Sequence, residues 1–157
     1  MQVFTPYPDP IECAKALWND KKRFNKQIIE CQQILDAIDG KKAWNNHPCT
    51  KMYKEHREWL MNYALCLQEY RNYERYYRTD YYSSARSKGK AVLYSIKADK
   101  MRPPFLTEEF CNQHKRRLFT KAPDLYPKFA EFGTSEINWY YVDGELLKYK
   151  DGKRIKE

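Results

Sequence analysis

Apolar residues recur at intervals of three and four along two long stretches of this chain, and that spacing limits the folds open to it. The first stretch begins near Asp20 and ends before Gly40. Its repeat is formed by Phe24, Ile28, Cys31, Leu35 and Ile38. Side chains at this spacing share one side of a helix, and glycine readily takes the left-handed conformation that ends one. The pattern therefore predicts an amphipathic helix that starts at Asn19 or Asp20 and ends at Gly40.

The second stretch lies between residues 52 and 70 and predicts the central helix of the fold. Its repeat is formed by Met52, His56, Trp59, Leu60, Tyr63, Leu67 and Tyr70. His56 is a lone histidine among charged neighbours, so we interpret it as a packed or hydrogen-bonded residue and not as a catalyst.

Capping and turn residues mark the remaining elements. Asp9-Pro10 predicts the start of a short helix that ends at Trp18, and Thr107 predicts the start of another helix. Residues 137–149 contain alternating aromatic and apolar residues around an Asp-Gly turn, which predicts a β-hairpin, and residues 150–153 can add a second turn. The sequence thus predicts a mainly α protein, a compact single-domain helical bundle with a small C-terminal β-hairpin.

The chain has 157 residues, which is long enough to bury a continuous core, so we expect residues 1–157 to form a single domain. Its five cysteines are odd in number and far apart, and none belongs to a Cys-x-x-Cys pair or has the histidine spacing of a zinc site. We therefore expect reduced, mostly buried thiols and no bound metal. These cysteines are Cys13, Cys31, Cys49, Cys66 and Cys111.

Basic residues outnumber acidic ones, with 29 Lys and Arg against 21 Asp and Glu, and the formal net charge is +8. This charge favours a polyanionic partner, either nucleic acid or an acidic surface, and does not choose between them. The first residues lack the cationic and apolar regions of a signal peptide, and no stretch approaches the roughly 18 apolar residues of a membrane span. We expect a soluble intracellular protein with no membrane partner, located in the cytoplasm, nucleoid or nucleus, including that of an infected host.

Tyrosines alternate with arginines and lysines between residues 70 and 100. Two interpretations are open: aromatic rings that stack on bases beside phosphate-binding cations, or a helix end whose tyrosines pack inward while its arginines are solvated. Residues 83–90, which are rich in Ser, Gly and Lys, predict a mobile loop that orders on DNA.

Four polar residues of the first long helix, three and four positions apart, can line a stripe distinct from its apolar side. They are Arg23, Lys26, Gln27 and Glu30. On spacing alone this stripe is either a solvated helix face or a surface that holds a polyanion and keeps one carboxylate for chemistry. The run His114-Lys115-Arg116-Arg117 is a second cationic patch, which either binds phosphate or complements the negative end of its helix.

Several short motifs follow one another along the chain. The first three are Met-Gln-x-Phe-x-Pro-Tyr-Pro-Asp at residues 1–9, Arg-x-x-Lys-Gln-x-x-Glu at residues 23–30 and Trp-x-Asn-His-Pro-x-x-Lys-Met at residues 44–52. Further motifs are Pro104-Phe105-Leu106, His114-Lys115-x-x-Leu118 and Lys121-x-Pro123-x-x-Tyr126. Together they resemble the pyrimidine-dimer DNA glycosylase family of the phage endonuclease V type. The resemblance covers residues 1–130 as a helical body and leaves residues 131–157 as a C-terminal ribbon.

This resemblance implies an enzyme that bends duplex DNA, displaces a base from the stack and uses its terminal α-amine as nucleophile. Met1 would carry the amine and Glu30 would be the catalytic acid, so that glycosylase and abasic-site lyase activity pass through a Schiff base without a cofactor. The substrate would be double-stranded DNA with a pyrimidine dimer or another damaged or modified base, bound by a monomer. The residues placed at the DNA are Arg23, Lys26, Gln27, Asn46, His47, Lys51, His114, Lys115 and Arg116. For His47, satisfying backbone groups in its own turn is an equal alternative.

The chain departs from the family pattern inside its most informative helix. Asn25 stands where the family has glycine, and Ile28 and Ile29 stand where a basic residue is common. The helix therefore presents less charge beside Glu30, which allows a different substrate preference. Two other hypotheses stay open: a non-catalytic DNA-binding or virus-type accessory protein on the same scaffold, and a module that binds another protein through its tyrosine-rich surface.

Overall fold

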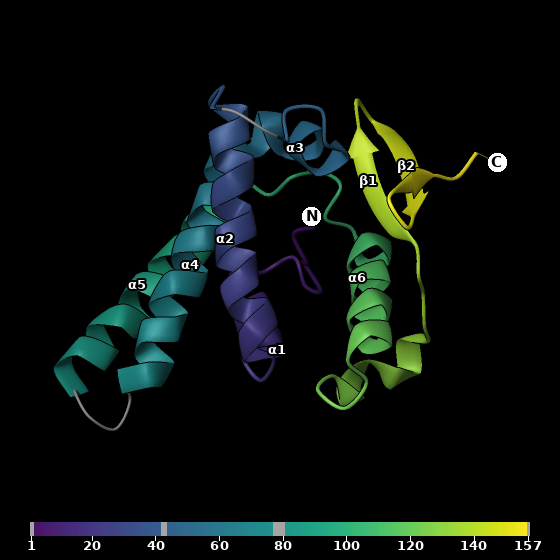
Figure 1. The fold of residues 1–157 in the computed structure, drawn as a ribbon. Coiled ribbons are helices and arrows are strands. Elements are labelled where there is room, and N and C mark those ends of the chain that lie inside the picture. Colours follow the sequence, from purple (N-terminus) through teal and green to yellow (C-terminus); the bar gives the residue numbers. More distant parts are fainter. Residues whose placement is uncertain (1, 42–43, 77–80, 157) are drawn as a thin grey trace.

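The computed structural model describes residues 2–41, 44–76 and 81–156, and in that part of the chain helices predominate (Figure 1). The α-helices are α1 (Pro10–Leu17), α2 (Lys21–Ile38), α3 (Pro48–Tyr53), α4 (Arg57–Tyr76), α5 (Tyr81–Lys100) and α6 (Glu108–Lys121). Two 3-10 segments are η1 (Lys54–His56) and η2 (Pro127–Phe132), and three strands are β1 (Asn138–Val142), β2 (Glu145–Lys150) and β3 (Lys153–Arg154). This architecture confirms the predicted mainly α fold with a small antiparallel ribbon at the end.

Local capping explains where three of the helices begin. Asp9 and His47 are both followed by proline at the first helical position, and each side chain accepts a hydrogen bond from a backbone N–H of the first turn. Thr107 caps α6 in the same way. These caps satisfy N–H groups that have no partner inside the helix, so they favour the starts of α1, α3 and α6 at these positions.

The predicted central helix is interrupted at its start. Instead of one helix from residue 52, the structure has α3, the 3-10 segment η1 and then α4. A 3-10 segment has three residues per turn, so it rotates the following helix relative to a continuous α-helix. This rotation brings Tyr53 and Trp59 onto one side, where their rings stack with centroids 5.8 Å apart. The prediction of a single helix was wrong for residues 52–56 because the packing of these two rings overrides the local repeat.

Residues 83–90, which the sequence predicts to be a mobile loop, belong to helix α5 in the structure. This helix packs antiparallel along α4, and the far ends of these two helices project beyond the rest of the molecule (Figure 1). Its buried residues are small and three or four positions apart: Ser87, Ala91, Ser95 and Ala98. Small side chains let two helices approach closely, and the same composition resembles a loop when only the sequence is read. The prediction was wrong because this apolar side is made of alanine and serine instead of large residues.

Gly89 offers a direct test of α5. An added Cβ at this position meets no atom within 4 Å. Because alanine restricts the unfolded chain and fits a helix better, Gly89→Ala should raise the free energy of unfolding by about 0.5–1 kcal/mol, as measured by urea unfolding followed by circular dichroism. Gly133 is the contrasting control, since its φ of +87° makes Gly133→Ala destabilising. A loss of stability in Gly89→Ala would contradict a helical α5.

The tyrosines at the start of the Tyr/Arg-rich segment pack inward. Tyr70 lies against Trp18 and Phe24, with ring centroids 6.0 and 6.4 Å away, and Tyr73 lies against Tyr70. This agrees with the packing interpretation for these two residues. The side chains of residues 76–84, which include the other tyrosines of the run except Tyr94, lie outside the described part of the structure.

The core is aromatic and encloses the start of the chain. Residues 2–5 are buried, and the largest fully buried side chains around them include Trp59, Tyr63 and Phe110. All five cysteines are free and buried, as predicted. The hairpin is also confirmed: β1 pairs with β2 around an Asp143-Gly144 turn in which both residues have positive φ. No helix among the described residues has the length and apolar character needed to cross a membrane.

Candidate active site

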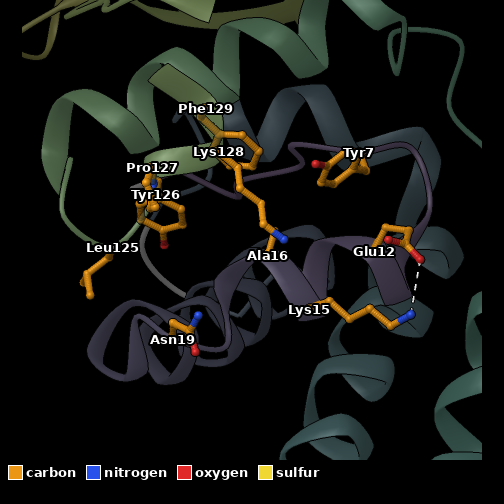
Figure 2. Close-up of a pocket in the computed structure, with 10 residues that line it drawn as sticks. All are labelled: Tyr7, Glu12, Lys15, Ala16, Asn19, Leu125, Tyr126, Pro127, Lys128 and Phe129. Carbon is orange, nitrogen blue, oxygen red and sulfur yellow. Dashed lines mark hydrogen bonds and ion pairs between the residues drawn. The ribbon is translucent and has the colours of Figure 1, made fainter. Parts of the chain in front are cut away.

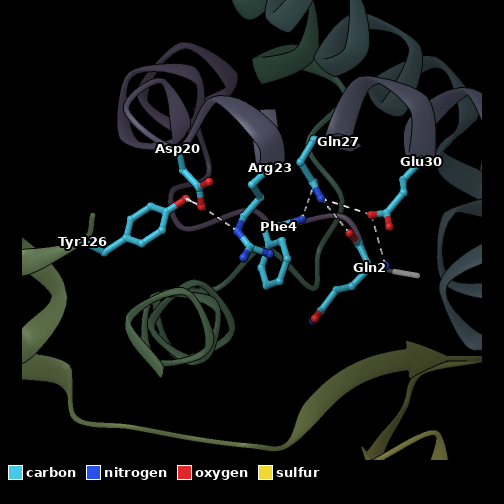
Figure 3. A network of polar contacts seen from close by, with 7 residues as sticks. All are labelled: Gln2, Phe4, Asp20, Arg23, Gln27, Glu30 and Tyr126. Carbon is cyan, nitrogen blue, oxygen red and sulfur yellow. Dashed lines mark hydrogen bonds and ion pairs between the residues drawn. The ribbon is translucent and has the colours of Figure 1, made fainter. Parts of the chain in front are cut away.

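The N-terminal segment is fixed by side chains from three different helices. Gln27 of α2 holds both ends of the segment, since its Oε1 accepts from the Phe4 N–H at 2.8 Å and its Nε2 donates to the Gln2 carbonyl at 2.9 Å. The Tyr63 hydroxyl of α4 donates to the Phe4 carbonyl at 2.6 Å. The Gln2 N–H donates to Oε2 of Glu30 at 3.4 Å (Figure 3). The first residues are therefore held directly against the candidate carboxylate.

Glu30 is buried except for 7% of its surface. Besides the Gln2 amide, its Oε2 accepts from Nε2 of Gln27 at 3.1 Å. Its Oε1 lies 3.8 Å from Nζ of Lys26, which is largely exposed. The carboxylate is thus oriented by two neutral donors, and its second oxygen faces an exposed cation on the open side.

A shallow pocket of about 100 Å³ opens over this carboxylate. The charged residues of its lining come from two helices, α2 and α6. The lining residues are Gln2, Phe4, Arg23, Lys26, Gln27, Glu30, Arg117, Lys121 and Asn138. Four cations surround one carboxylate in this lining, so the pocket is suited to a polyanion.

The cations of the pocket are close enough to repel one another. The pKa of Lys121 is lowered by burial and further by Arg117, Arg23 and Lys26. Burial also lowers the pKa of Arg117, whose guanidinium donates to Oδ1 of Asn138 at 2.8 Å. An incoming anion relieves this repulsion, which makes the pocket a favourable place for phosphate groups.

Arg23 is held at the edge of the pocket by a buried polar chain (Figure 3). Its Nε donates to Oδ2 of Asp20 at 2.8 Å, and the same oxygen accepts from the Tyr126 hydroxyl at 2.9 Å. The guanidinium also lies over the Phe4 ring, 5.4 Å from its centroid. These contacts leave its terminal nitrogens as the groups available to a ligand.

A larger pocket of about 260 Å³ lies beside Tyr126, at the junction of α1 and η2 (Figure 2). Tyr7, Tyr126 and Phe129 give it aromatic walls, and its acid and base, Glu12 and Lys15, pair with each other at 3.4 Å. The side chain of Glu12 is about half exposed (48%), whereas Glu30 is buried and accepts a hydrogen bond from the N-terminal segment. The smaller pocket over Glu30 is therefore the better candidate.

Comparison with known proteins identifies the family. The family model described as pyrimidine dimer DNA glycosylase matches residues 1–80, which is just over half of the 157 residues. The protein belongs to this family. No curated protein and no solved structure matched the chain.

Membership in the glycosylase family confirms the resemblance carried by the motifs at residues 1–9, 23–30 and 44–52, and it indicates DNA as the substrate. Helix α6 lies beyond the matched residues, so Arg117 and Lys121 enter the site from the geometry alone. From the sequence, Arg117 was only a member of the cationic run 114–117, and Lys121 had no predicted role at the DNA. A signal was present, because the two lie one helical turn apart, but only the fold shows that they face α2.

The structure brings together part of the predicted glycosylase site. Arg23, Lys26, Gln27 and Glu30 line the pocket. Gln27 is only 1% exposed, and the hydrogen bonds described above bind its amide to the N-terminal segment. Gln27 therefore holds the N-terminal segment in place, whereas the sequence analysis predicted that it would hydrogen-bond to DNA. Met1 lies outside the described residues.

The residues predicted around α3 are not among those that line the pocket. His47 accepts from the Cys49 N–H through Nδ1 at 3.1 Å, and burial lowers its pKa, so it caps α3 as a neutral ring. Asn46 is exposed beside it. Lys51 is exposed and lines a different pocket of about 390 Å³ next to Tyr141. The backbone-satisfying interpretation of His47 is thus the one that matches its contacts.

The predicted cationic patch on α6 is divided by the fold. His114 has no exposed surface, so its ring presents nothing to DNA. Lys115 is inserted between the rings of Tyr7 and Phe132, 4.5 and 4.6 Å from their centroids, and Arg116 donates to the Phe132 carbonyl at 2.8 Å. These contacts replace the predicted phosphate contacts of His114 and Lys115 with packing, because their side of α6 faces the core.

His114 fixes the far end of the N-terminal segment. Its Nδ1 accepts from the Thr5 N–H at 2.7 Å, so the neutral ring carries its hydrogen on Nε2. Nε2 lies 3.4 Å from the side-chain amide of Gln2. Rotating that amide by 180° supplies the oxygen acceptor that this tautomer needs. Complete burial and the charge of Arg117 lower the pKa of His114 to about 3.

Stability should therefore fall as the pH falls below the pKa of an unfolded histidine. The unfolded chain takes up this proton near pH 6.5 and the folded chain only near pH 3, so protonation favours unfolding between those values. The effect of His114 at the acid end is on the order of 5 kcal/mol. Urea unfolding of wild type and His114→Asn across this range measures it. The variant should be less stable at neutral pH and show a shallower pH dependence, and parallel pH profiles would contradict the assignment.

Proposed function

We propose that this protein removes pyrimidine dimers or related damaged bases from duplex DNA and then cleaves the abasic strand, with the α-amine of Met1 as nucleophile and Glu30 as the catalytic carboxylate. The observation that carries the proposal is the position of Glu30, which accepts a hydrogen bond from Gln2 on the floor of a cationic pocket. Family membership supports the glycosylase step. The lyase step and the Schiff base follow from the chemistry of the groups at this site.

Covalent geometry limits how far the nucleophile can lie from the acid. The α-amine of Met1 is separated from the Gln2 amide nitrogen by three covalent bonds, whose lengths sum to about 4.3 Å. That amide nitrogen is 3.4 Å from Oε2 of Glu30. An amine tethered at this point stays within the reach of a water-mediated or direct contact with the carboxylate. The proposal requires that Met1 carry a free amine.

The chemistry suits an amine and one carboxylate. The α-amine of an unperturbed peptide has a pKa of about 7.7–8.0, so a large fraction is neutral and nucleophilic near neutral pH. Its attack on C1′ of the deoxyribose displaces the base, which leaves with the glycosidic electron pair and takes up a proton. Ring opening then gives an iminium. The cationic imine acidifies a C2′ proton, and removal of that proton expels the 3′ phosphate by β-elimination.

Glu30 has two tasks in this sequence. Its negative charge stabilises the cationic sugar in the first step, and the same carboxylate can accept or relay the C2′ proton in the second. The hydrogen bonds from Gln2 and Gln27 hold one oxygen in place and leave Oε1 directed to the open side. Preorganisation of this kind avoids the cost of orienting the carboxylate during the reaction.

The size and charge of the pocket support a sugar-phosphate segment as its occupant. About 100 Å³ is smaller than the roughly 300 Å³ at which ligand pockets for whole small molecules begin. A displaced pyrimidine dimer does not fit, whereas a deoxyribose edge and its flanking phosphates do. Arg23, Lys26, Arg117 and Lys121 would hold those phosphates from both sides and present C1′ to the amine.

Borohydride trapping tests the proposal. The protein is incubated with a duplex that contains one cyclobutane pyrimidine dimer, with an abasic duplex and with an undamaged duplex, each with and without borohydride. We expect a covalent protein–DNA adduct on the first two substrates and a strand break where the reductant is absent. Absence of adduct and break on both damaged duplexes would overturn the proposed activity and leave a protein that only binds DNA.

A further inference from the structure

A second group of cations lies on the other side of α2. Lys21 of α2 and Arg71 and Arg75 of α4 surround a pocket of about 180 Å³. The remaining lining residues are Trp18, Phe24 and Asn25, and none of the six lines the pocket over Glu30. At about 100° per residue, Lys21 and Asn25 point away from the direction of Lys26 and Glu30. The two cation groups therefore flank the same helix.

These three cations are poorly neutralised by the protein. Among the described residues none of them forms a salt bridge, and the acid that acts on Lys21, Glu74, is also hydrogen-bonded to Tyr70. Nε of Arg71 is buried and has no hydrogen-bond partner in the described part of the chain. A buried donor without a partner is uncommon, and a guanidinium without a counter-ion is costly to bury, so an anion that comes to this group is favoured.

Two contacts keep the group in place without neutralising it. Lys21 Nζ lies over the Trp18 ring, 3.3 Å from its centroid. Nη1 of Arg71 donates to Oδ1 of Asn25 at 3.0 Å. Asn25 is one of the three residues that the sequence analysis gives as departures from the family pattern, and in this structure its side chain positions an arginine of the Tyr/Arg-rich segment. Repulsion from Arg75 contributes to the lowered pKa of both Lys21 and Arg71.

The exposed surface of α2 forms a ridge between the two pockets, and Lys26 belongs both to this ridge and to the lining of the pocket over Glu30. The four exposed residues of the ridge follow one another at intervals of four, three and four positions: Lys22, Lys26, Ile29 and Gln33. A helix with its side chains is about 10–12 Å across, and the wider groove of a duplex is about 12 Å wide. One helix can therefore separate two rows of phosphates, with a cation group facing each row.

We propose that Lys21, Arg71 and Arg75 bind phosphate groups of the DNA strand across the groove from the strand held at the Glu30 pocket, with the ridge of α2 between them. This inference uses the duplex substrate of the proposed function but not the amine chemistry. It gives Asn25 and the first arginines of the Tyr/Arg-rich segment a role in DNA binding through phosphate contacts. Tyr70 and Tyr73 do not stack on bases in this arrangement.

The salt dependence of duplex binding tests this site. Each phosphate contact adds about 0.9 to the slope of log affinity against log salt, so the double variant Lys21→Gln/Arg75→Gln should lower that slope by about two. Affinity at about 0.1 M salt should fall between tenfold and a hundredfold. In an ethylation-interference experiment, ethylation of single phosphates on one strand should weaken binding of the wild type but no longer weaken binding of the double variant. The matched control is Lys97→Gln/Lys100→Gln on α5, which removes the same charge at exposed positions and should keep the wild-type slope within half a unit.

Three other outcomes of these experiments have different consequences for the proposed phosphate site. An unchanged slope in the double variant, with a melting temperature equal to wild type, would overturn the inference even if borohydride trapping succeeds. A lowered slope in a protein that gives no adduct supports the second site and rejects only the proposed chemistry. Inorganic phosphate is the other source of this anion. If it raises the melting temperature of wild type but not of the variant, and the DNA slope is unchanged, the site binds free phosphate and the assignment to DNA is wrong.

Discussion

Glu30→Gln is expected to reduce dimer removal by a factor of 10² to 10⁴, the range associated with loss of a general acid–base or charge-stabilising group. Duplex affinity should change little, because the substitution keeps the size of the side chain and its amide oxygen can still accept from the Gln2 N–H. What disappears is the negative charge beside the developing cation at C1′. Single-turnover cleavage of a dimer-containing duplex and equilibrium binding by fluorescence anisotropy measure the two quantities separately.

Glu131→Gln is the matched control for this change, since Glu131 is exposed and away from the pocket. It should retain wild-type turnover. If Glu30→Gln turns over normally, the carboxylate only anchors the N-terminal segment. If it loses binding and folding stability together with turnover, the result points to the same structural role, and the catalytic assignment of Glu30 fails.

Addition of one glycine before Met1 is expected to eliminate the borohydride-trapped adduct. The extension converts the amine of Met1 into an amide, whose nitrogen is not nucleophilic, and moves the new amine away by one residue, about 3.3–3.6 Å of extended chain. The Gln2–Glu30 and Phe4–Gln27 hydrogen bonds need no free amine, so the fold and the affinity for duplex should be unchanged. Adduct yield on an abasic duplex is the measurement.

A glycine added after Glu157 is the control and should leave trapping intact. Retained trapping in the N-terminal extension would instead identify a lysine as the nucleophile. Lys26 is then the first residue to examine, because its Nζ is 3.8 Å from Oε1 of Glu30. Lys26→Gln in the extended protein would decide between that lysine and a more distant one.

Features that depend on neighbouring residues were the ones predictable from sequence. The Asp9-Pro10 and Thr107 caps, the end of α2 near Gly40 and the Asp-Gly hairpin all follow from local backbone preferences. The stripe from Arg23 to Glu30 was also readable, because it needs only helical spacing.

Features that depend on packing between distant segments were missed. The loop predicted for residues 83–90 is part of helix α5, because the buried side of this helix consists of alanine and serine, which indicate a helix only when α4 lies against them. Arg117 and Lys121 were not assigned to the site because their approach to α2 is set by the fold of the whole chain. His114 was assigned to the surface for its basic neighbours, although the Thr5 N–H requires it inside.

The burial of residues 2–5 has a consequence for the order in which the protein matures. The segment is synthesised before its partners, and one of them, His114, lies far along the chain, with Thr5 and His114 separated by 109 residues. Contacts of this sequence separation form late, because the intervening chain must be ordered before they can close. A nascent chain on the ribosome therefore has an unsecured segment at residues 2–5 until α6 emerges. The pocket at Glu30 is completed only after that point, so premature termination before α6 would leave helices α1 to α5 without an assembled site.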